Sequence, residues 1–242
     1  MTAVPAIPAA TVVLLRDGQR GLETLMLRRN ANLAFAGGMW VWPGGRLDPD
    51  DYPGGEPDDD PAVLQDSARR AAVREAREEA DLAVDPDSLV WFSHWTPPPI
   101  SPKRFATWFF AAPAPAGAVH IDGGEIHGHA WMTPAEAMAR RNALELALSP
   151  PTWITLEHLA VFDSTDQALG ALAARSPEWF ATRFATLEGG AVALYDGDAG
   201  YEDEDPDRPG ARHRLWMVGD TWRYERSSGP VSAEDSEGSE GS

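Results

Sequence analysis

The sequence predicts an α/β protein, because short apolar runs of strand character alternate with segments of helical character as far as residue 162. Asp17-Gly18 forms a turn between the first two runs, and Thr133-Pro134 supplies an N-cap and a first-turn proline for a helix. The expected strands are 11–16, 24–29, 39–42, 89–95 and 105–112. The expected helices are 66–80, one from 133 onward, and 152–162.

Residues beyond 162 have a small α+β character of their own. A helix is expected at 166–174, and strands at 184–195 and 214–224 flank an acidic loop, 196–207, that we expect to lack order. Trp216, Trp222 and Tyr224 alternate with period two, which is typical of one strand face packed on a core. We therefore predict a main domain at 1–162 with an acidic insertion at about 49–62, an extension at 163–226, and a disordered acidic tail at 227–242.

The composition excludes several classes of protein. The 242 residues contain no cysteine, so disulfides, thiol catalysis and cysteine zinc sites are excluded. The net charge is -18 and Lys103 is the single lysine, so no basic stripe exists for a nucleic-acid polymer. No apolar run reaches the ~18 residues of a membrane span, and the first residues lack the charged start of a signal peptide. These features predict a cytoplasmic protein without a membrane partner.

The most informative segment is 74–79, with the sequence Arg-Glu-Ala-Arg-Glu-Glu. On a helix, Glu75, Glu78 and Glu79 stand at i, i+3 and i+4, so their Cβ atoms lie about 5 to 6 Å apart on one face. The repulsion between Glu75 and Glu79, at i and i+4, destabilises the helix by on the order of 0.2 to 0.5 kcal/mol. A hard divalent cation such as Mg²⁺ or Mn²⁺ would offset this cost. The alternative is an ordinary solvated face in which Arg74 and Glu78 form an i, i+4 pair.

A glycine turn precedes this helix. Pro43-Gly44-Gly45 directly follows the apolar run 39–42, so a strand ends in a turn where the backbone can approach a ligand or a metal ion closely. By itself the tripeptide is equally typical of a plain turn. A strand, a glycine turn and an acidic helix in this order favour an enzyme that acts on phosphates.

In these segments the chain resembles the Nudix hydrolases, whose signature is a glycine, five residues, Glu, seven residues, and then Arg-Glu-aliphatic-any-Glu-Glu-any-Gly-aliphatic. Gly45 resembles the opening glycine, and residues 74–82 resemble the closing half. About 15 residues are inserted between them, Asp66 falls where the first Glu belongs, and Asp81 replaces the final glycine. The resemblance covers roughly residues 8 to 162 and implies an α/β/α sandwich with a mixed sheet.

The inserted residues have the composition of a solvated loop. Residues 48–60 carry seven acids together with Pro-Gly and Gly-rich turn elements. Each doubling of loop length costs only about 0.6 kcal/mol in closure entropy, so the signature can be split without loss of the fold. Binding of a second cation by these acids is the alternative.

The resemblance implies Mg²⁺ or Mn²⁺ as the cofactor, with Glu75, Glu78, Glu79 and the Gly44 carbonyl as its ligands. It implies hydrolysis of the diphosphate bridge of a nucleoside diphosphate linked to another moiety, with a metal-activated water as the nucleophile. The expected partner is therefore a small-molecule diphosphate. The oligomeric state stays open, with a homodimer as one alternative.

Catalytic roles fall on three residues. Arg74 would orient a neighbouring carboxylate. Glu125 resembles the loop acid that many family members place opposite the helix, and either Glu125 or Glu78 would take the proton from the attacking water. A solvent-exposed loop glutamate is the alternative reading of Glu125.

The substrate is less sharply indicated. Arg29 and Arg104 are candidates for holding phosphate by bidentate hydrogen bonds, and Trp95 is a further candidate contact. The runs 35–45, 95–97 and 104–105 resemble the coenzyme A diphosphatase branch of the family, although Ala34 stands where that branch has an arginine. Coenzyme A or acyl-CoA is thus the favoured substrate. ADP-ribose or NADH, or a catalytically silent nucleotide sensor, are the alternatives.

Overall fold

The computed structural model describes residues 5–33, 36–99, 101 and 103–227. The chain divides into two compact units, Met1–Ala181 and Thr182–Ser242. The first unit ends later than the boundary expected at residue 162, because strand β8 (Glu178–Ala181) pairs with the main sheet and helix α4 (Thr165–Ala173) packs on it. Except for Ser227, the expected tail at 227–242 lies outside the described residues.

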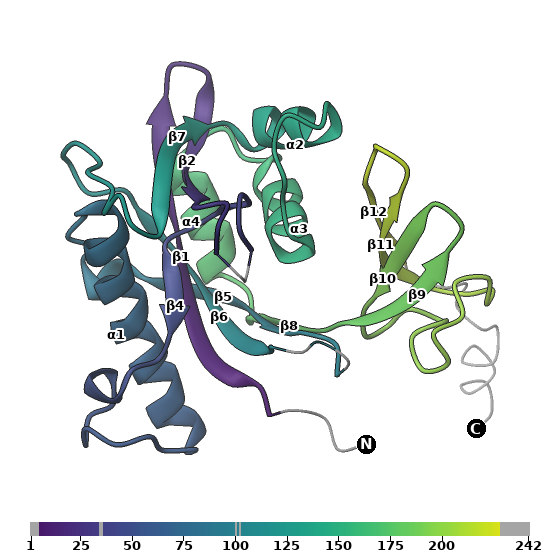
Figure 1. Cartoon of the computed structure of the whole chain (residues 1–242), viewed down its shortest axis with the longest axis horizontal. Helices are drawn as coiled ribbons and strands as arrows, with labels where there is room; N and C mark the ends of the chain where they lie inside the picture. The colour runs from purple at the N-terminus through teal and green to yellow at the C-terminus, as the bar shows by residue number, and fades with distance from the viewer. Residues whose placement is uncertain (1–4, 34–35, 100, 102, 228–242) are drawn as a thin grey trace, which may run out of the picture. The chain divides into compact units, whose positions relative to one another are not determined.

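The described part of the first unit contains an eight-stranded sheet (Figure 1). Six strands follow the order β3-β2-β1-β6-β5-β8, while β4 pairs with β1 and β7 pairs with β2. β1 runs parallel to β6 and β5 runs parallel to β8, whereas the other pairs are antiparallel, so the sheet is mixed as expected. The remaining bounds are β1 (Ile7–Gly18), β2 (Gly21–Arg29), β3 (Trp40–Val41), β4 (Gly44–Arg46), β5 (Val90–Thr96), β6 (Phe105–Pro113) and β7 (Ile126–Met132).

Helices cover both faces of this sheet. Helix α1 (Pro61–Ala80) lies on one side, and helices α2 (Pro134–Asn142), α3 (Pro150–Leu159) and α4 lie on the other (Figure 1). Because both faces are covered, the central strand β1 is apolar without alternation. Its residues Val12, Val13, Leu14 and Leu15 are fully buried.

Helix α1 is placed by its ends and by its small buried face. The Asp60 carboxylate caps the first turn by accepting the N–H groups of Ala62 and Val63 at 2.9 and 3.3 Å, so the helix begins at Pro61 rather than near 66. Asp81 ends it in the left-handed conformation, with φ 55°, at the position where the family signature has glycine. The buried alanines let the helix lie close to the sheet, and they are Ala68, Ala71, Ala72, Ala76 and Ala80.

The second unit contains a four-stranded antiparallel sheet with the order β12-β11-β10-β9. Each long strand predicted there is a hairpin, because Gly189 and Gly219 turn the chain with φ of 79° and 67°. Trp216 and Tyr224 therefore lie on different strands with Trp222 between them, and the predicted common strand face was wrong. The strands are β9 (Arg183–Leu187), β10 (Gly190–Leu194), β11 (Arg212–Val218) and β12 (Arg223–Ser227).

A buried ion pair orders the acidic loop 196–207, which was expected to lack order. The side chains of Arg214 and Asp198 are both fully buried, and Arg214 Nε and Nη2 donate to the Asp198 carboxylate at 2.7 and 2.6 Å. Asp198 also accepts the N–H groups of Gly200 and His213 at 2.9 and 2.8 Å. A fully hydrogen-bonded charge pair in a low-dielectric environment specifies one conformation. The acid count of the loop could not show that one of its acids is buried.

The acidic insertion is structured where it begins. Asp51, at the end of the short 3-10 helix Pro49–Asp51, is 4% exposed, and Tyr52 is 6% exposed within the core under α1. Arg74 donates two hydrogen bonds to Asp51, from Nε to Oδ1 at 3.2 Å and from Nη2 to Oδ2 at 2.9 Å. Residues 53–60 are exposed. The solvated part of the insertion is therefore 53–60, which is shorter than the loop predicted from composition.

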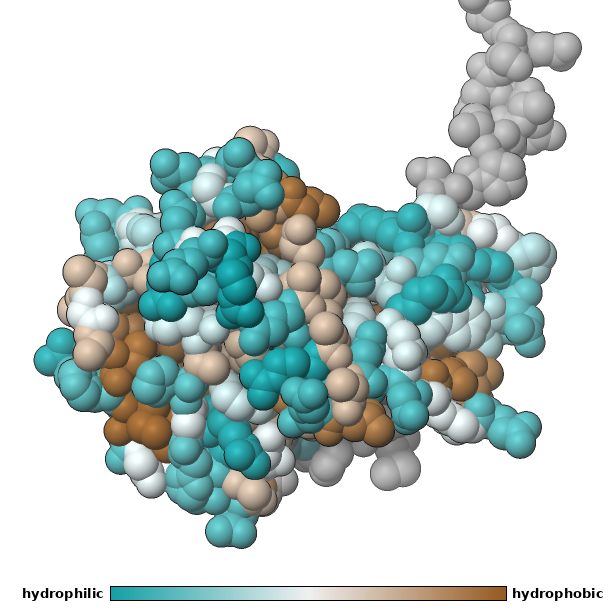
Figure 2. Space-filling view, turned by 90° about the horizontal axis from the view of Figure 1, so that it is seen from above, coloured by the Kyte–Doolittle hydropathy of each residue, from teal (hydrophilic) through white to brown (hydrophobic). Residues whose placement is uncertain are grey.

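The acid surplus of the chain is carried at the surface. On the face drawn in Figure 2, hydrophilic residues predominate and hydrophobic residues form small separate groups. In the described part of the chain, no helix has both the length and the apolar character that crossing a membrane requires. The exposed large hydrophobic residues are Ile7, Leu144, Val161, Trp179 and Val218.

Replacing Asp51 by alanine is expected to lower the free energy of unfolding by about 1 to 3 kcal/mol, because Arg74 loses its buried partner. Asp66→Ala is the matched control, since Asp66 pairs with Arg70 at 2.9 Å but both side chains are 49% exposed. It should cost less than about 1 kcal/mol. Urea unfolding followed by circular dichroism measures both, and equal losses would contradict the difference in burial.

Replacing Pro53–Asp59 by a short Gly/Ser linker is expected to change the free energy of unfolding by less than about 1 kcal/mol, because these residues are exposed and loop length is cheap. A replacement that begins at Pro49 also removes Asp51 and Tyr52 and should cost about 3 kcal/mol or more. The same unfolding measurement compares the two chains. A large loss from the shorter replacement would show that the exposed acids stabilise the fold.

Candidate active site

The glycine turn is held in place by two buried hydrogen bonds. Trp42 Nε1 donates to Thr24 Oγ1 at 2.8 Å, and Thr11 Oγ1 donates to the Pro43 carbonyl at 2.7 Å. These bonds connect the turn to β2 and β1, the two strands nearest to it in the sheet. The backbone of Gly44 is therefore fixed before any ligand is considered.

A side chain at either position of the turn would meet an atom of the site. A Cβ atom at Gly44 would lie 2.6 Å from the Ala10 carbonyl oxygen, and one at Gly45 would collide with the carboxylate of Glu75. The missing side chains let helix α1 bring its acids against the backbone of β4. The Gly44 N–H donates to Glu79 Oε2 at 3.0 Å, so the glycine turn and the acidic helix form one site.

Arg74 joins the acids on one side of the site. Its Nη1 donates to Glu75 Oε1 and to Glu78 Oε2, both at 2.9 Å. Its Nε and Nη2 donate to Asp51, and Nη2 also donates to the Arg46 carbonyl at 3.1 Å. Burial lowers the pKa of Arg74, but the hydrogen bond to Asp51 and the charge of Glu75 raise it by more than burial lowers it. The net shift is upward, so the guanidinium stays charged.

The structure corrects the position of the insertion in the signature. Asp66, which was aligned with the first Glu of the signature, lies on the exposed face of α1 and pairs with Arg70. Asp51 has the contact with Arg74 instead. Five residues, 46 to 50, separate Gly45 from Asp51, which is the spacing that the signature requires from its glycine. Counting from the glycine rather than from Arg74 would have found Asp51 in the sequence.

The helix carboxylates differ in exposure. The side chains of Glu79 and Glu75 are 8% and 13% exposed, whereas that of Glu78 is 57% exposed. Burial raises the pKa of Glu79 to about 8, although the Gly44 N–H opposes the shift. Burial also raises the pKa of Glu75, against the lowering effect of Arg74. The charges of Glu75 and Glu79 repel each other, as the helical spacing predicted.

Arg29 lies between Glu79 and Glu125. Its Nη1 is 3.9 Å from Glu79 Oε1, and its Nη2 donates to Glu125 Oε2 at 3.1 Å. The loop acid predicted from sequence is therefore joined through one cation to the buried helix acid. Arg29 was expected to hold substrate phosphate, and in this structure its donors face protein carboxylates.

Two predicted substrate contacts lie apart from these acids. Trp95 is 3% exposed, its ring stacks on Phe180 with centroids 3.8 Å apart, and its Nε1 donates to Ser93 Oγ at 3.1 Å. That side chain is buried in the first unit, so the structure gives no support to the expected contact between Trp95 and a ligand, which stays a prediction. Arg104, the residue before β6, donates from Nη2 to the Pro97 carbonyl at 3.0 Å.

Arg104 is also distant from the glycine turn. The β1 register pairs Thr11 with Gly44 and Ile7 with Phe105, the residue after Arg104. Thr11 and Ile7 are four residues apart on one strand, which is about 13 Å. The Arg104 backbone thus lies too far from Gly44 for both residues to contact one phosphate group.

The acids at the turn have the donor chemistry of a hard divalent cation, because carboxylate and carbonyl oxygens are what Mg²⁺ and Mn²⁺ prefer. Glu79 accepts the Gly44 N–H and the Glu75 carboxylate lies against Gly45, and the burial of Glu79 leaves a carboxylate whose charge the fold only partly offsets. Across the described residues, no three His, Cys, Asp or Glu side chains converge tightly enough to form a ready metal cluster. Glu75 and Glu78 are turned toward Arg74 instead.

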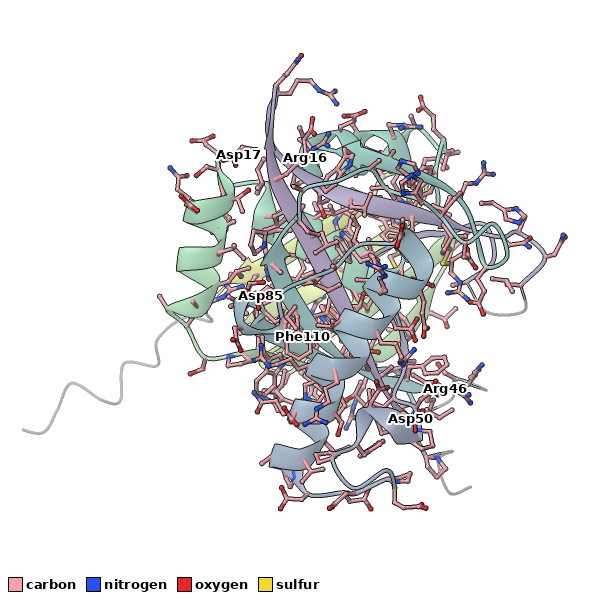
Figure 3. The ribbon with its side chains drawn as sticks, turned by 90° about the vertical axis from the view of Figure 1, so that its left-hand side faces the viewer. Arg16, Asp17, Arg46, Asp50, Asp85 and Phe110 are labelled. Carbon is pink, nitrogen blue, oxygen red and sulfur yellow. The ribbon has the colours of Figure 1, made fainter. Side chains whose placement is uncertain are left out.

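The part of α1 that carries Arg74 lies beside the loop after β4. Figure 3 places Arg46 and Asp50 together next to this helix, while Asp85 lies well apart from them. The Arg46 carbonyl accepts a hydrogen bond from Arg74. Arg46 and Asp50 therefore lie on the side of the site where the insertion begins.

Several solved structures are similar to this chain. The solved NUDIX hydrolase from Alicyclobacillus acidocaldarius superposes with a TM-score of 0.61 at 22% identity, over 72% of this chain and 99% of that one. A MutT NUDIX hydrolase from Burkholderia pseudomallei gives a TM-score of 0.47 at 20% identity, over 64% of this chain and 98% of that one. The NUDIX domain of Shewanella oneidensis NrtR, solved with ADP ribose, gives 0.46 at 16% identity, over 64% and 86%.

No curated protein matches the sequence. The NUDIX domain family matches residues 5–154, which is more than half of the chain and includes every residue of the candidate site. Seven strands of the mixed sheet, the glycine turn and the acidic helix fall within the matched segment, and only β8 of the described sheet lies beyond it. The chain therefore belongs to the NUDIX domain family.

Proposed function

We propose that this Nudix pyrophosphohydrolase is a divalent-metal-dependent enzyme that cleaves the diphosphate bridge of a nucleoside diphosphate linked to another moiety. The observation that carries the proposal is the contact between the glycine turn and α1. There the Gly44 N–H holds the buried Glu79 carboxylate, and the acids of residues 75 and 78 lie on the same side of the helix. Small-molecule phosphates are the class of substrate that such a site accepts.

Glu75, Glu78, Glu79 and the Gly44 carbonyl would hold Mg²⁺ or Mn²⁺. When bound, the cation supplies charge to the phosphoryl oxygens and lowers the pKa of a bound water. The chain's own residues divide the remaining work. Arg74 orients the carboxylates of Glu75 and Glu78, and its bonds to Asp51 keep the guanidinium in place.

Two carboxylates are candidates for taking the proton from the attacking water. Glu78 is exposed on the helix and Glu125 is exposed on the loop, so solvent reaches both carboxylates. Glu79 is the weaker candidate because it is buried and bonded to the Gly44 N–H. We propose Glu125 as the base, since its partner Arg29 also faces Glu79.

We further propose coenzyme A or an acyl-CoA as the substrate, on the strength of the sequence runs around the glycine turn and β5–β6. Arg104 lies about 13 Å from the turn along the sheet, which is too far for the diphosphate itself. A large substrate spans such a distance. Arg104 is therefore the candidate for the additional 3'-phosphate, and Arg29 for the neighbourhood of the diphosphate.

Glu79→Gln is expected to lower kcat at least about a hundredfold and to abolish the stabilisation of the protein by Mg²⁺ or Mn²⁺. The variant should also make the metal-free protein more stable, by on the order of 1 kcal/mol at pH above 8. The folded-state pKa of Glu79 lies above its ordinary value, so its ionisation destabilises the fold as pH rises from about 4.5 to about 8. The stability difference should therefore disappear below that window.

Thermal unfolding with and without metal, together with product chromatography, measures these effects. Glu56→Gln is the matched control, because Glu56 is an exposed acid of the insertion, and it should behave as the wild type. Full activity of Glu79→Gln in the presence of metal would refute the proposed site.

If coenzyme A is the substrate, the products are 3',5'-ADP and a 4'-phosphopantetheine. A charged bidentate contact is worth roughly 1.5 to 3 kcal/mol, so a 3'-dephospho analogue should be hydrolysed about ten to a hundred times less efficiently. Arg104→Met should remove most of this preference without changing hydrolysis of the analogue. Kinetics of kcat/KM on both compounds measure it, and preference for ADP-ribose over coenzyme A would overturn the assignment.

A further inference from the structure

Glu125 is the one proposed catalytic acid that no helix holds. Its side chain is 59% exposed, and it precedes β7 in the connection from β6. A carboxylate on an exposed loop reaches a reacting water reliably only if its backbone is fixed, because a displacement of about 1 Å can cost on the order of a hundredfold in rate. The bonds around residues 122–126 therefore decide whether this acid can act.

The residue after Glu125 is fixed by the core. Ile126 is fully buried and packs in the cluster under α1. The pairing of β7 with β2 shifts register between Arg28 and Arg29, so a bulge lies directly beside Glu125. Bulges of this kind change the direction of a side chain at the end of a ladder. The core thus sets where the chain leaves the sheet toward Glu125.

Asp122 fixes the chain on the other side of Glu125. Its Oδ2 accepts the Glu125 N–H and its Oδ1 accepts the Ile126 N–H, both at 2.9 Å. Gly123 turns the chain between them with φ 72°. One carboxylate therefore closes the whole turn, in the way that Asx turns are closed.

Asn30, the residue after strand β2, is hydrogen-bonded to the same turn. Its backbone N–H donates to the Glu125 carbonyl at 2.7 Å, and its Nδ2 donates to the Gly124 carbonyl at 3.1 Å. Its Oδ1 accepts the Asn32 N–H at 3.0 Å, which fixes the side chain itself. The turn is thereby attached to β2 at the residue that follows Arg29.

The attachment has a consequence for charge. Because Asn30 follows Arg29 in the chain, the bonds from Asn30 hold Glu125 beside the Arg29 guanidinium, at 3.1 Å. The other Nη of Arg29 faces Glu79 at 3.9 Å. The positions of the loop acid and of the buried helix acid are thus related through Arg29, the last residue of β2, and Asn30, which follows it.

We propose that Asn30 and Asp122 are positioning residues for hydrolysis, which hold the Glu125 carboxylate facing the Glu79 side of the site. The proposal rests on the proposed function, because it presumes that Glu125 takes part in the reaction. Neither residue touches the substrate in this account. Each acts through the backbone on both sides of Glu125.

A double-mutant cycle tests the proposal with Mg²⁺ and a diphosphate substrate that the wild type hydrolyses. Asn30→Ala and Asp122→Ala are each expected to lower kcat roughly ten- to a hundredfold while KM changes by less than about twofold. In a Glu125→Ala background, the same two substitutions should cause no further loss, because the group they position is gone. Additive losses in that background would overturn the proposal and show a general structural role.

Three further measurements make the result decisive. Asp85→Ala is the matched control, because Asp85 closes a similar turn by accepting the Asp87 N–H at 3.0 Å, away from Arg46 and Asp50 in Figure 3, and it should keep wild-type kcat. Should an alanine variant unfold in a thermal scan, Asn30→Asp and Asp122→Asn replace it, since each removes a hydrogen bond and keeps the shape. Their unchanged kcat would overturn the proposal.

The failure of the proposed function is distinguishable from this outcome. A wild type that hydrolyses no diphosphate compound refutes the function before any variant is compared. A wild type that is active, with Glu125→Ala equally active, refutes the role of Glu125 as base and with it the positioning role of Asn30 and Asp122, but leaves the proposed diphosphate hydrolysis standing.

Discussion

The guanidinium of Arg74 is the interaction on which the candidate site depends. One side of it, Nε and Nη2, is bonded to the buried Asp51 and to the Arg46 carbonyl, and the other side, Nη1, is bonded to Glu75 and Glu78. A planar group with five fixed donors can satisfy several acceptors at once, which an ammonium group could not do in the same geometry. The loop after β4 and the acidic face of α1 therefore share one cation. Without it the buried Asp51 would lose its counter-charge.

The site keeps charges together that would separate in water. Glu79 is buried with a single backbone donor and a cation at 3.9 Å, and its raised pKa records the cost. That cost is sustained because α1 is held to the sheet by its row of buried alanines and by caps at both ends. Arg74 contacts the acids from α1 itself, and Arg29 contacts them from the end of β2. A stable helix thus carries an unstable arrangement of carboxylates, which is typical of sites where a bound group completes the electrostatics.

The sequence was sufficient for the fold class, for five strands of the main sheet and for the acidic helix, because apolar period and capping residues carry that information locally. Asp81 in the left-handed conformation at the end of α1 is of this kind. Strands β4, β7 and β8 were not predicted. The burial of Asp51, Asp198 and Trp95 could not be predicted, since it depends on partners far along the chain. The acid counts of 48–60 and 196–207 indicated solvated loops, yet Asp51 pairs with the half-buried Arg74 and Asp198 pairs with the buried Arg214. Arginine partners are what composition alone does not reveal.

The two ends of the exposed segment 53–60 are fixed independently of each other. Asp51 and Tyr52 are held by Arg74 and the core, while Asp60 caps α1. The exposed residues between Tyr52 and Asp60 can therefore be changed without moving either fixed end. A foreign peptide or a fluorescent label can be inserted there, close to the helix that bears the acids. This part of the chain offers a natural place for a reporter that senses events at the carboxylates from outside them.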